Sequence, residues 1–195
     1  MYINMNYSIL KKLCMTPSPS GYEKKIVDYI CSNRYRHFTS NKSKVNSCTM
    51  ESKTNHNKTI LVDAHIDQVH LRIIRFHEDG FAVVQTIGLR HDVVLGTVVT
   101  DISGKYSGVI CTMPPHIRLE TKDEIKNHPR YYVDFGMNKK QIQKIFSVGE
   151  PLMYKQHYTE LASNNLSSTG LDNKTSVFIL LELLKYFDKN IKELK

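Results

Sequence analysis

The chain has 195 residues, 41% of them hydrophobic, so it can bury a real core as one large domain or two small ones. This composition excludes an intrinsically disordered protein, and no apolar run approaches the roughly 20 residues of a membrane-spanning helix. The net charge of +8 raises the question of nucleic-acid binding. However, 20 of the 27 basic residues are scattered lysines, whereas base readers favour the arginine fork. We therefore expect neither a nucleic-acid nor a membrane partner.

The N-terminus favours a cytoplasmic protein. The opening residues MYINMNYSILKKLC lack a charged leader, a long apolar segment and a small-residue cleavage site, so we expect no signal peptide. The cysteines are widely spread, with no C-x-x-C pair, and in a cytosolic chain they are most simply free thiols. We predict four free thiols and no structural zinc site. The cysteines are Cys14, Cys31, Cys48 and Cys111.

The N-terminal part is predicted to contain two helices and a polar segment. A short helix over 7–15 precedes the rigid turn TPSPSG, whose prolines stop that helix from continuing. A second helix is predicted over 20–32, because Ser20 and Glu23 fit a capping box and apolar residues follow at helical spacing. Residues 37–58 are rich in Ser, Asn and Lys, which predicts a loop or a weak hairpin.

Residues 59–65, TILVDAH, are apolar nearly to the end and predict a strand buried on both faces of an α/β sheet. The strand ends on His65, and Asp67 follows two positions later. Because strand side chains alternate, these two side chains project from the same face. A carboxylate often holds the ring of a metal-binding histidine, so H-x-D at a strand end indicates either part of a metal site or an ordinary polar strand end.

The middle of the chain has a different pattern. From 69 to about 160, short strand-like segments alternate with turn signals such as EDG and PPH, which predicts a small β-barrel. One helix is predicted within it, around 138–146. After residue 165 the helical period returns, with an apolar stripe typical of a packed helix. Asp172 stands where this helix opens and could act simply as its N-cap.

This order predicts one domain inserted into another. Residues 1–67 and 162–195 would form the interrupted α/β domain, and residues 68–161 the inserted barrel.

Seven motifs lie in order along nearly the whole chain: PSPSGYE (17–23), AHIDQV (64–69), EDGFAVVQTIG (78–88), GVICTMPPH (108–116), YYVDFG (131–136), VGEPLMY (148–154) and GLDNKTSVFILLELL (170–184). Together they resemble the glutamyl-aminopeptidase family of cytosolic dinuclear-metal peptidases. Relatives in this family form tetrahedral twelve-subunit particles, and some members carry an endoglucanase or cellulase label. The resemblance implies an α/β zinc-peptidase domain interrupted after its H-x-D strand by a PDZ-like barrel.

The resemblance also implies roles for three residues. His65 looks like a terminal ligand of one metal ion, and Asp172 like the carboxylate that bridges two ions, either zinc or cobalt. Asp67 is similar to the family's catalytic aspartate beneath the histidine ligand. The implied reaction removes N-terminal residues from peptides: two divalent ions hold a water and lower its pKa, while a glutamate takes the proton. Implied partners are peptide substrates and further copies of the chain.

Several family features are missing. In the family, the general-base glutamate and three more metal ligands lie further along the chain, so two of five expected ligands are present here. Catalytic zinc sites generally use three protein ligands. We therefore expect a C-terminally truncated chain that alone is inactive, poorly stable and unable to hold the two ions. Gln68 and His70 also replace the glutamate and glycine that are usual in the family.

Two other functions remain as alternatives. A non-catalytic binding or oligomerisation module derived from such a peptidase would use the barrel for contacts between subunits. A glycoside hydrolase is the weaker alternative, suggested only by the labels of some family members. It requires two carboxylates about 5–9.5 Å apart across a sugar, and no pair in this sequence identifies itself as such.

Overall fold

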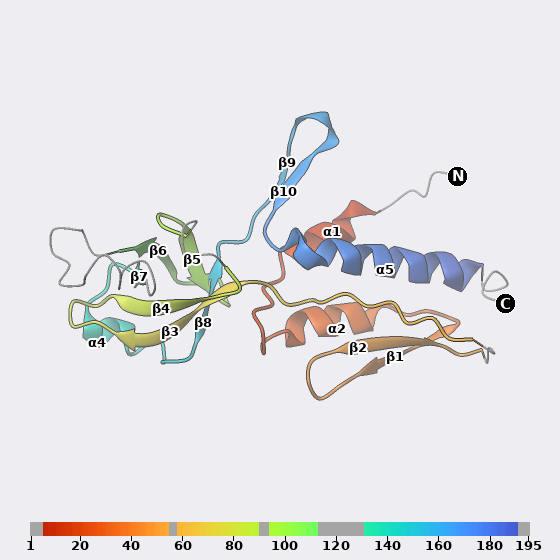
Figure 1. Cartoon of the computed structure of the whole chain (residues 1–195), viewed down its shortest axis with the longest axis horizontal. Coiled ribbons are helices and arrows are strands. Elements are labelled where there is room, and N and C mark those ends of the chain that lie inside the picture. Colours follow the sequence, from red (N-terminus) through yellow and green to blue (C-terminus); the bar gives the residue numbers. More distant parts are fainter. Residues whose placement is uncertain (1–5, 55–57, 90–93, 113–130, 191–195) are drawn as a thin grey trace. The chain divides into compact units, whose positions relative to one another are not determined.

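The computed structural model describes residues 6–54, 58–89, 94–112 and 131–190. The chain divides into two compact units (Figure 1). Unit 1 combines Met1–Gln68 with Gln156–Lys195, and unit 2 is Val69–Lys155. The chain therefore leaves unit 1 and returns to it. The sequence analysis placed this return at 162, whereas unit 2 ends at Lys155.

The described residues of unit 1 form three α-helices around one apolar cluster. These are α1 (Tyr7–Cys14), α2 (Lys24–Ser32) and α5 (Leu171–Lys189), and α1 lies alongside α5 in Figure 1. Helix α1 confirms the short helix predicted over 7–15. The buried cluster consists of Leu10, Leu13, Cys14, Ile26, Ile30, Val177, Phe178 and Leu181. Among the described residues, no helix is long and apolar enough to cross a membrane.

The predicted start of the second helix is wrong. Helix α2 begins at Lys24, and its N-cap residue Glu23 makes no side-chain capping hydrogen bond. Gly21 has a φ of +90°, which ends any helical backbone between Ser20 and Lys24. Glu23 accepts a hydrogen bond from the Gly21 N–H at 2.7 Å, while the Ser20 hydroxyl donates to Asp67. The S-x-x-E pattern therefore serves a turn and a tertiary contact.

A short hairpin follows α2. Strands β1 (Phe38–Lys42) and β2 (Cys48–Ser52) pair antiparallel, which confirms the weak hairpin expected within 37–58. A second hairpin, β9 (Tyr158–Glu160) with β10 (Leu166–Ser168), precedes α5; the single-turn helix η3 (Ala162–Asn164) joins its strands.

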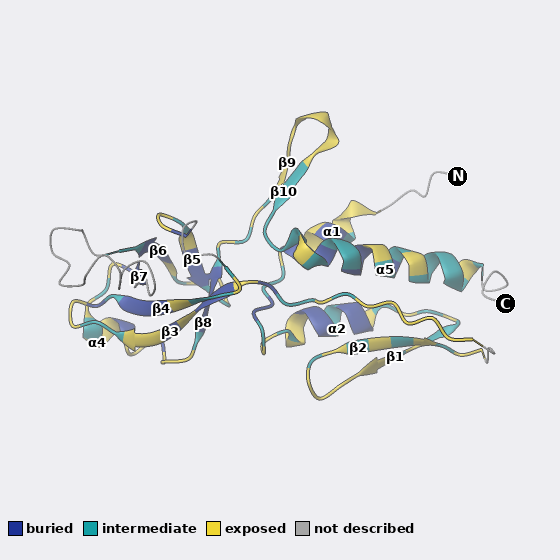
Figure 2. Cartoon of the chain, in the orientation of Figure 1, coloured by how far each residue is buried: buried dark blue, intermediate teal, exposed yellow. Residues whose placement is uncertain are grey.

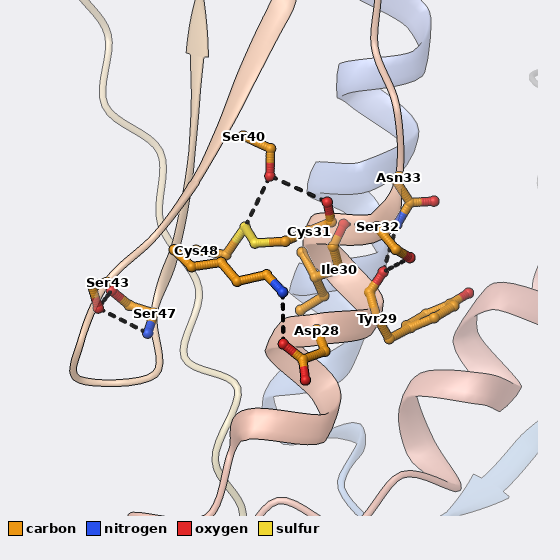
Figure 3. The surroundings of a disulfide bond; sticks show 11 residues. Asp28, Tyr29, Ile30, Cys31, Ser32, Asn33, Ser40, Ser43, Ser47 and Cys48 are labelled. Atoms are coloured by element: carbon orange, nitrogen blue, oxygen red, sulfur yellow. Dashed lines mark hydrogen bonds and ion pairs between the residues drawn. A yellow bond between two sulfur atoms is a disulfide. The ribbon is translucent and has the colours of Figure 1, made fainter.

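A disulfide joins the end of α2 to the first hairpin (Figure 3). It links Cys31 to Cys48, so the prediction of four free thiols is wrong for these two residues. Their Cα atoms lie 6.3 Å apart because the hairpin folds back onto the helix, a contact that the spacing of 17 residues does not reveal. Cys14 and Cys111 are free thiols, as predicted.

The buried strand predicted over 59–65 is also wrong. This segment forms no strand, and most of it is exposed (Figure 2). The exposed fractions are 87% for Ile60, 83% for Leu61 and 60% for Val62. No backbone hydrogen bond joins residues 60–64 to another described segment. An apolar strand becomes buried only when neighbouring strands and helices cover it, and the described part of unit 1 pairs no strand with this one.

Unit 2 is a closed barrel with the strand order β3-β4-β7-β6-β5-β8, all neighbours being antiparallel. The strands are β3 (His70–Phe76), β4 (Ala82–Ile87), β5 (Val98–Asp101), β6 (Ser107–Cys111), β7 (Tyr131–Asp134) and β8 (Pro151–Tyr154). This confirms the small barrel. Helix α4 (Lys139–Ile142) is shorter than the predicted 138–146 and begins at a capping box of Asn138 and Gln141.

Two glycines of unit 2 permit a test of barrel packing. Gly80 and Gly96 have φ values of +93° and +76°, but a Cβ at Gly80 would lie 2.0 Å from the Met137 carbonyl oxygen, whereas Gly96 faces open space. Left-handed backbone costs alanine about 1 kcal/mol. We expect Gly96→Ala to lose about that much free energy of unfolding in urea denaturation, and Gly80→Ala about 2 kcal/mol. Equal losses would contradict the clash.

Candidate metal centre

Three segments of unit 1 meet at the candidate site: the turn before α2, the H-x-D segment and the start of α5. The turn holds the H-x-D segment through the backbone, since Pro19 bridges to Gln68 in parallel orientation. The Gln68 N–H donates to the Ser18 carbonyl at 2.9 Å, and the Ser18 hydroxyl donates to the Ile66 carbonyl at 2.7 Å. The rigid TPSPSG turn thus supports the backbone that carries the histidine.

His65 lies between two carboxylates from distant parts of the chain. Its Nδ1 is 3.1 Å from Asp67 Oδ1, and its Nε2 is 3.2 Å from Asp172 Oδ1. His65 and Asp172 are 107 residues apart in the sequence. The structure therefore brings together all three residues that the sequence analysis selected.

The neighbours of His65 and Asp67 change their proton affinities. Burial alone would lower the pKa of the His65 imidazole, but hydrogen bonds to Asp67 and Asp172 and the charges of both outweigh burial and raise it. The Ser20 hydroxyl donates to Asp67 Oδ2 at 2.5 Å and is the main cause that lowers the pKa of Asp67; His65 adds to this lowering. Asp67 is therefore ionised at neutral pH and can hold the imidazole through Nδ1.

Asp172 does not behave as the simple helix cap that its position allowed. The N-cap residue of α5 is Gly170, and no side-chain hydrogen bond caps the helix. The side chain of Asp172 is 94% exposed, and among the described residues its carboxylate contacts His65 rather than helix N–H groups. The carboxylate is thus accessible to an ion from solvent.

The chemistry and spacing of these atoms fit a divalent metal ion. Two N and O ligands at 2.0–2.1 Å from a tetrahedral zinc lie about 3.3 Å apart, close to the 3.2 Å between His65 Nε2 and Asp172 Oδ1. With Nε2 as ligand, Nδ1–H would donate to Asp67, the usual carboxylate–histidine arrangement. The described residues hold no group of three or more His, Cys, Asp or Glu side chains placed for one ion. The site therefore offers two donors.

The sequence analysis missed Ser20 and Lys174. Ser20 was interpreted as a helix-capping residue, so its contact with Asp67 was not expected. Lys174 is fully buried in the site and falls in helical phase with Val177 and Leu181 on the apolar stripe of α5. A lysine in such a stripe indicates a buried ammonium group, which was a usable signal.

Residues 46–194 match the family model described as M42 glutamyl aminopeptidase. The chain belongs to the M42 glutamyl aminopeptidase family. This confirms the resemblance inferred from the seven sequence motifs.

Individual relatives agree with this membership. The M42 chain is 22% identical to a lysyl aminopeptidase of Pyrococcus furiosus, over 91% of this chain and 54% of the relative. It resembles an aminopeptidase structure from the archaeon Desulfurococcus kamchatkensis with a TM-score of 0.77 and 26% identity, covering 92% of this chain and 51% of that one. It also resembles the Pyrococcus horikoshii TET1 peptidase, with a TM-score of 0.76, 24% identity and coverage of 94% and 56%.

The chain thus spans about half the length of these M42 relatives. Its mixed α/β fold is similar to that of the part of the Desulfurococcus kamchatkensis aminopeptidase structure that it covers.

Proposed function

We propose that His65 and Asp172 supply the first two donors of a divalent-metal site, zinc or cobalt, in an aminopeptidase that removes N-terminal residues from peptides. The observation that supports it most is the 3.2 Å approach of His65 Nε2 to Asp172 Oδ1 across 107 residues of sequence. Membership of the M42 family supports the peptidase class.

Each residue has a distinct role in this proposal. His65 offers its Nε2 lone pair, and Asp67 holds the ring by accepting a hydrogen bond at Nδ1. Asp172 has two carboxylate oxygens and can contact two ions at once. A bound divalent ion supplies Lewis-acid chemistry, which acidifies water and polarises the scissile carbonyl.

Two donors are one fewer than a catalytic zinc ion generally has. We propose that the chain by itself binds an ion weakly and hydrolyses no aminoacyl substrate, because further donors and a general base are needed. We also propose that the barrel of unit 2 is a PDZ-like insertion in a zinc-peptidase domain. A homo-oligomeric state is part of the proposal, since the TET1 relative assembles into a tetrahedron or a large octahedral shell.

Calorimetric titration of the chain with Zn²⁺ or Co²⁺ tests the site. We expect His65→Ala and Asp172→Ala each to weaken the ion's affinity at least about tenfold, because each removes one of two donors. His77→Ala is a matched control: His77 and Asp79 form another H-x-D pair, with Nδ1 3.2 Å from the carboxylate, on a turn of the barrel. This variant is expected to keep the wild-type affinity.

The proposal fails if the wild-type chain binds neither ion, or if His77→Ala weakens binding as much as His65→Ala. Absence of binding would instead favour the non-catalytic module derived from a peptidase.

A further inference from the structure

Lys174 is fully buried near the start of α5. Its Nζ donates to the Thr16 carbonyl at 2.7 Å and to the side-chain oxygen of Gln68. A Cβ at Gly170 would lie 3.3 Å from this Nζ and 3.4 Å from the Gln68 oxygen, so a glycine leaves room for the contact. One ammonium group therefore joins the three segments that form the candidate site.

The two acceptors of this ammonium are neutral oxygens. In the described part of the chain, Lys174 makes no ion pair with a carboxylate, unlike Lys24, Lys42, Lys139 and Lys185. Burying a cation without a counter-ion costs free energy, and methionine would fill similar space without that cost. Lysine is therefore poorly suited to packing here, but well suited to linking two segments through directional, charge-assisted hydrogen bonds.

The linked atoms stand next to the metal-site residues. Gln68 directly follows Asp67, and Lys174 comes two residues after Asp172. Asp172 is 94% exposed, so packing does not hold its side chain. Its place relative to His65 depends on the backbone at the start of α5, which Lys174 ties to the H-x-D segment.

Gln68 is itself held from two other sides. Its backbone pairs with Ser18, and its side-chain amide donates to Gln156 at 3.4 Å. Gln156 in turn accepts a hydrogen bond at 3.1 Å from the hydroxyl of Thr169, a residue just before α5. Lys174 thus binds to an acceptor that is already fixed in place.

We propose that Lys174 is a positioning residue that sets the separation of His65 and Asp172 by holding Gln68 and Thr16 against the start of α5. It acts through these segments and contacts neither proposed ligand. The inference rests on the proposed function for its use in metal binding, but the geometry itself can be measured without metal.

The test uses the full chain labelled with ¹⁵N-histidine, in EDTA, with the two ring-nitrogen NMR signals of His65 assigned from His65→Gln. The Asp172→Ala variant shows where the His65 ring-nitrogen signals lie when the contact with Asp172 is lost. We expect Lys174→Met to move the Nε2 signal most of the way to that position while circular dichroism shows a folded chain. Lys185→Met is the matched control, because Lys185 lies further along α5 and pairs with Glu182. It should leave both signals unchanged.

A folded Lys174→Met chain with wild-type His65 signals overturns the proposal. If this variant does not fold, Gln68→Met removes one acceptor of the same ammonium and must shift the Nε2 signal in the same direction; an unchanged signal overturns the proposal equally. Zn²⁺ titration of Lys174→Met should give at least about tenfold weaker binding than wild type. A wild-type chain that binds no Zn²⁺ contradicts the proposed function, and the NMR comparison still decides the role of Lys174.

Discussion

Replacing Cys31 and Cys48 by serine is expected to lower the free energy of unfolding of unit 1 by about 3 kcal/mol. The disulfide closes a loop between residues 17 apart in the sequence, and the loss of chain entropy in the unfolded state for such a loop corresponds to about that value. The bond joins α2, which contributes Ile26 and Ile30 to the apolar cluster, to the first hairpin. The double variant should therefore unfold at lower urea concentration, as followed by circular dichroism.

Dithiothreitol provides the matched control for this prediction. It should destabilise the wild-type chain by the same amount and leave the double serine variant unchanged, because Cys14 and Cys111 are free thiols in both proteins. A wild-type chain whose urea midpoint does not respond to reduction would show that the bond contributes nothing to stability.

The second large effect is a dependence of stability on alkaline pH. Burial lowers the pKa of Lys174 from 10.5 to about 8, and a smaller electrostatic effect of Cys14 opposes this. Between these two values the unfolded chain holds the proton more tightly than the folded chain does. The contribution of Lys174 to the free energy of unfolding therefore rises with pH, by about 3 kcal/mol from pH 8 to 10.5, and is flat below pH 8.

To check this prediction, the wild type and Lys174→Met are denatured with urea in EDTA at intervals across this pH range. Burial also raises the pKa of the Cys14 thiol, which lowers stability as the pH rises above 9. Because both proteins share this effect, the informative quantity is the free energy of unfolding of the wild type minus that of the variant. That difference should grow by about 3 kcal/mol from pH 8 to 10.5. Gln68→Glu gives the ammonium a carboxylate partner and should flatten the wild-type slope. A constant difference would mean that Lys174 keeps its ordinary pKa in the folded chain.

Local patterns in the sequence predicted the elements that depend on local contacts. Helix α1 precedes a proline-rich turn, and the barrel strands have strand-like composition with turn residues at their ends; both were found as predicted. The errors arose where a distant segment decides the outcome. Ser20 bonds to Asp67 instead of capping a helix, and Cys31 meets Cys48 because a hairpin folds back.

The sequence predicted part of the candidate site. H-x-D identified His65 and Asp67, and the family resemblance added Asp172, which no spacing rule connects to a residue 107 positions earlier. Lys174 was missed because a lysine at a helix start is ordinarily solvated, although its place on the apolar stripe of α5 was a signal of burial. The cytoplasmic location stays a prediction. The four free thiols were expected because the chain was taken as cytosolic, and the disulfide between Cys31 and Cys48 contradicts that expectation.

The two units differ in how much of their backbone is free to pair with another polypeptide. In the part of unit 2 that the structure describes, every barrel strand has a hydrogen-bonded neighbour on both sides, so the sheet has no free edge there. The apolar run at Ile60, Leu61 and Val62 differs, since its side chains are exposed and its amide groups make no backbone hydrogen bond to another described residue. An exposed apolar segment with free backbone groups is the kind of surface on which another strand can pair.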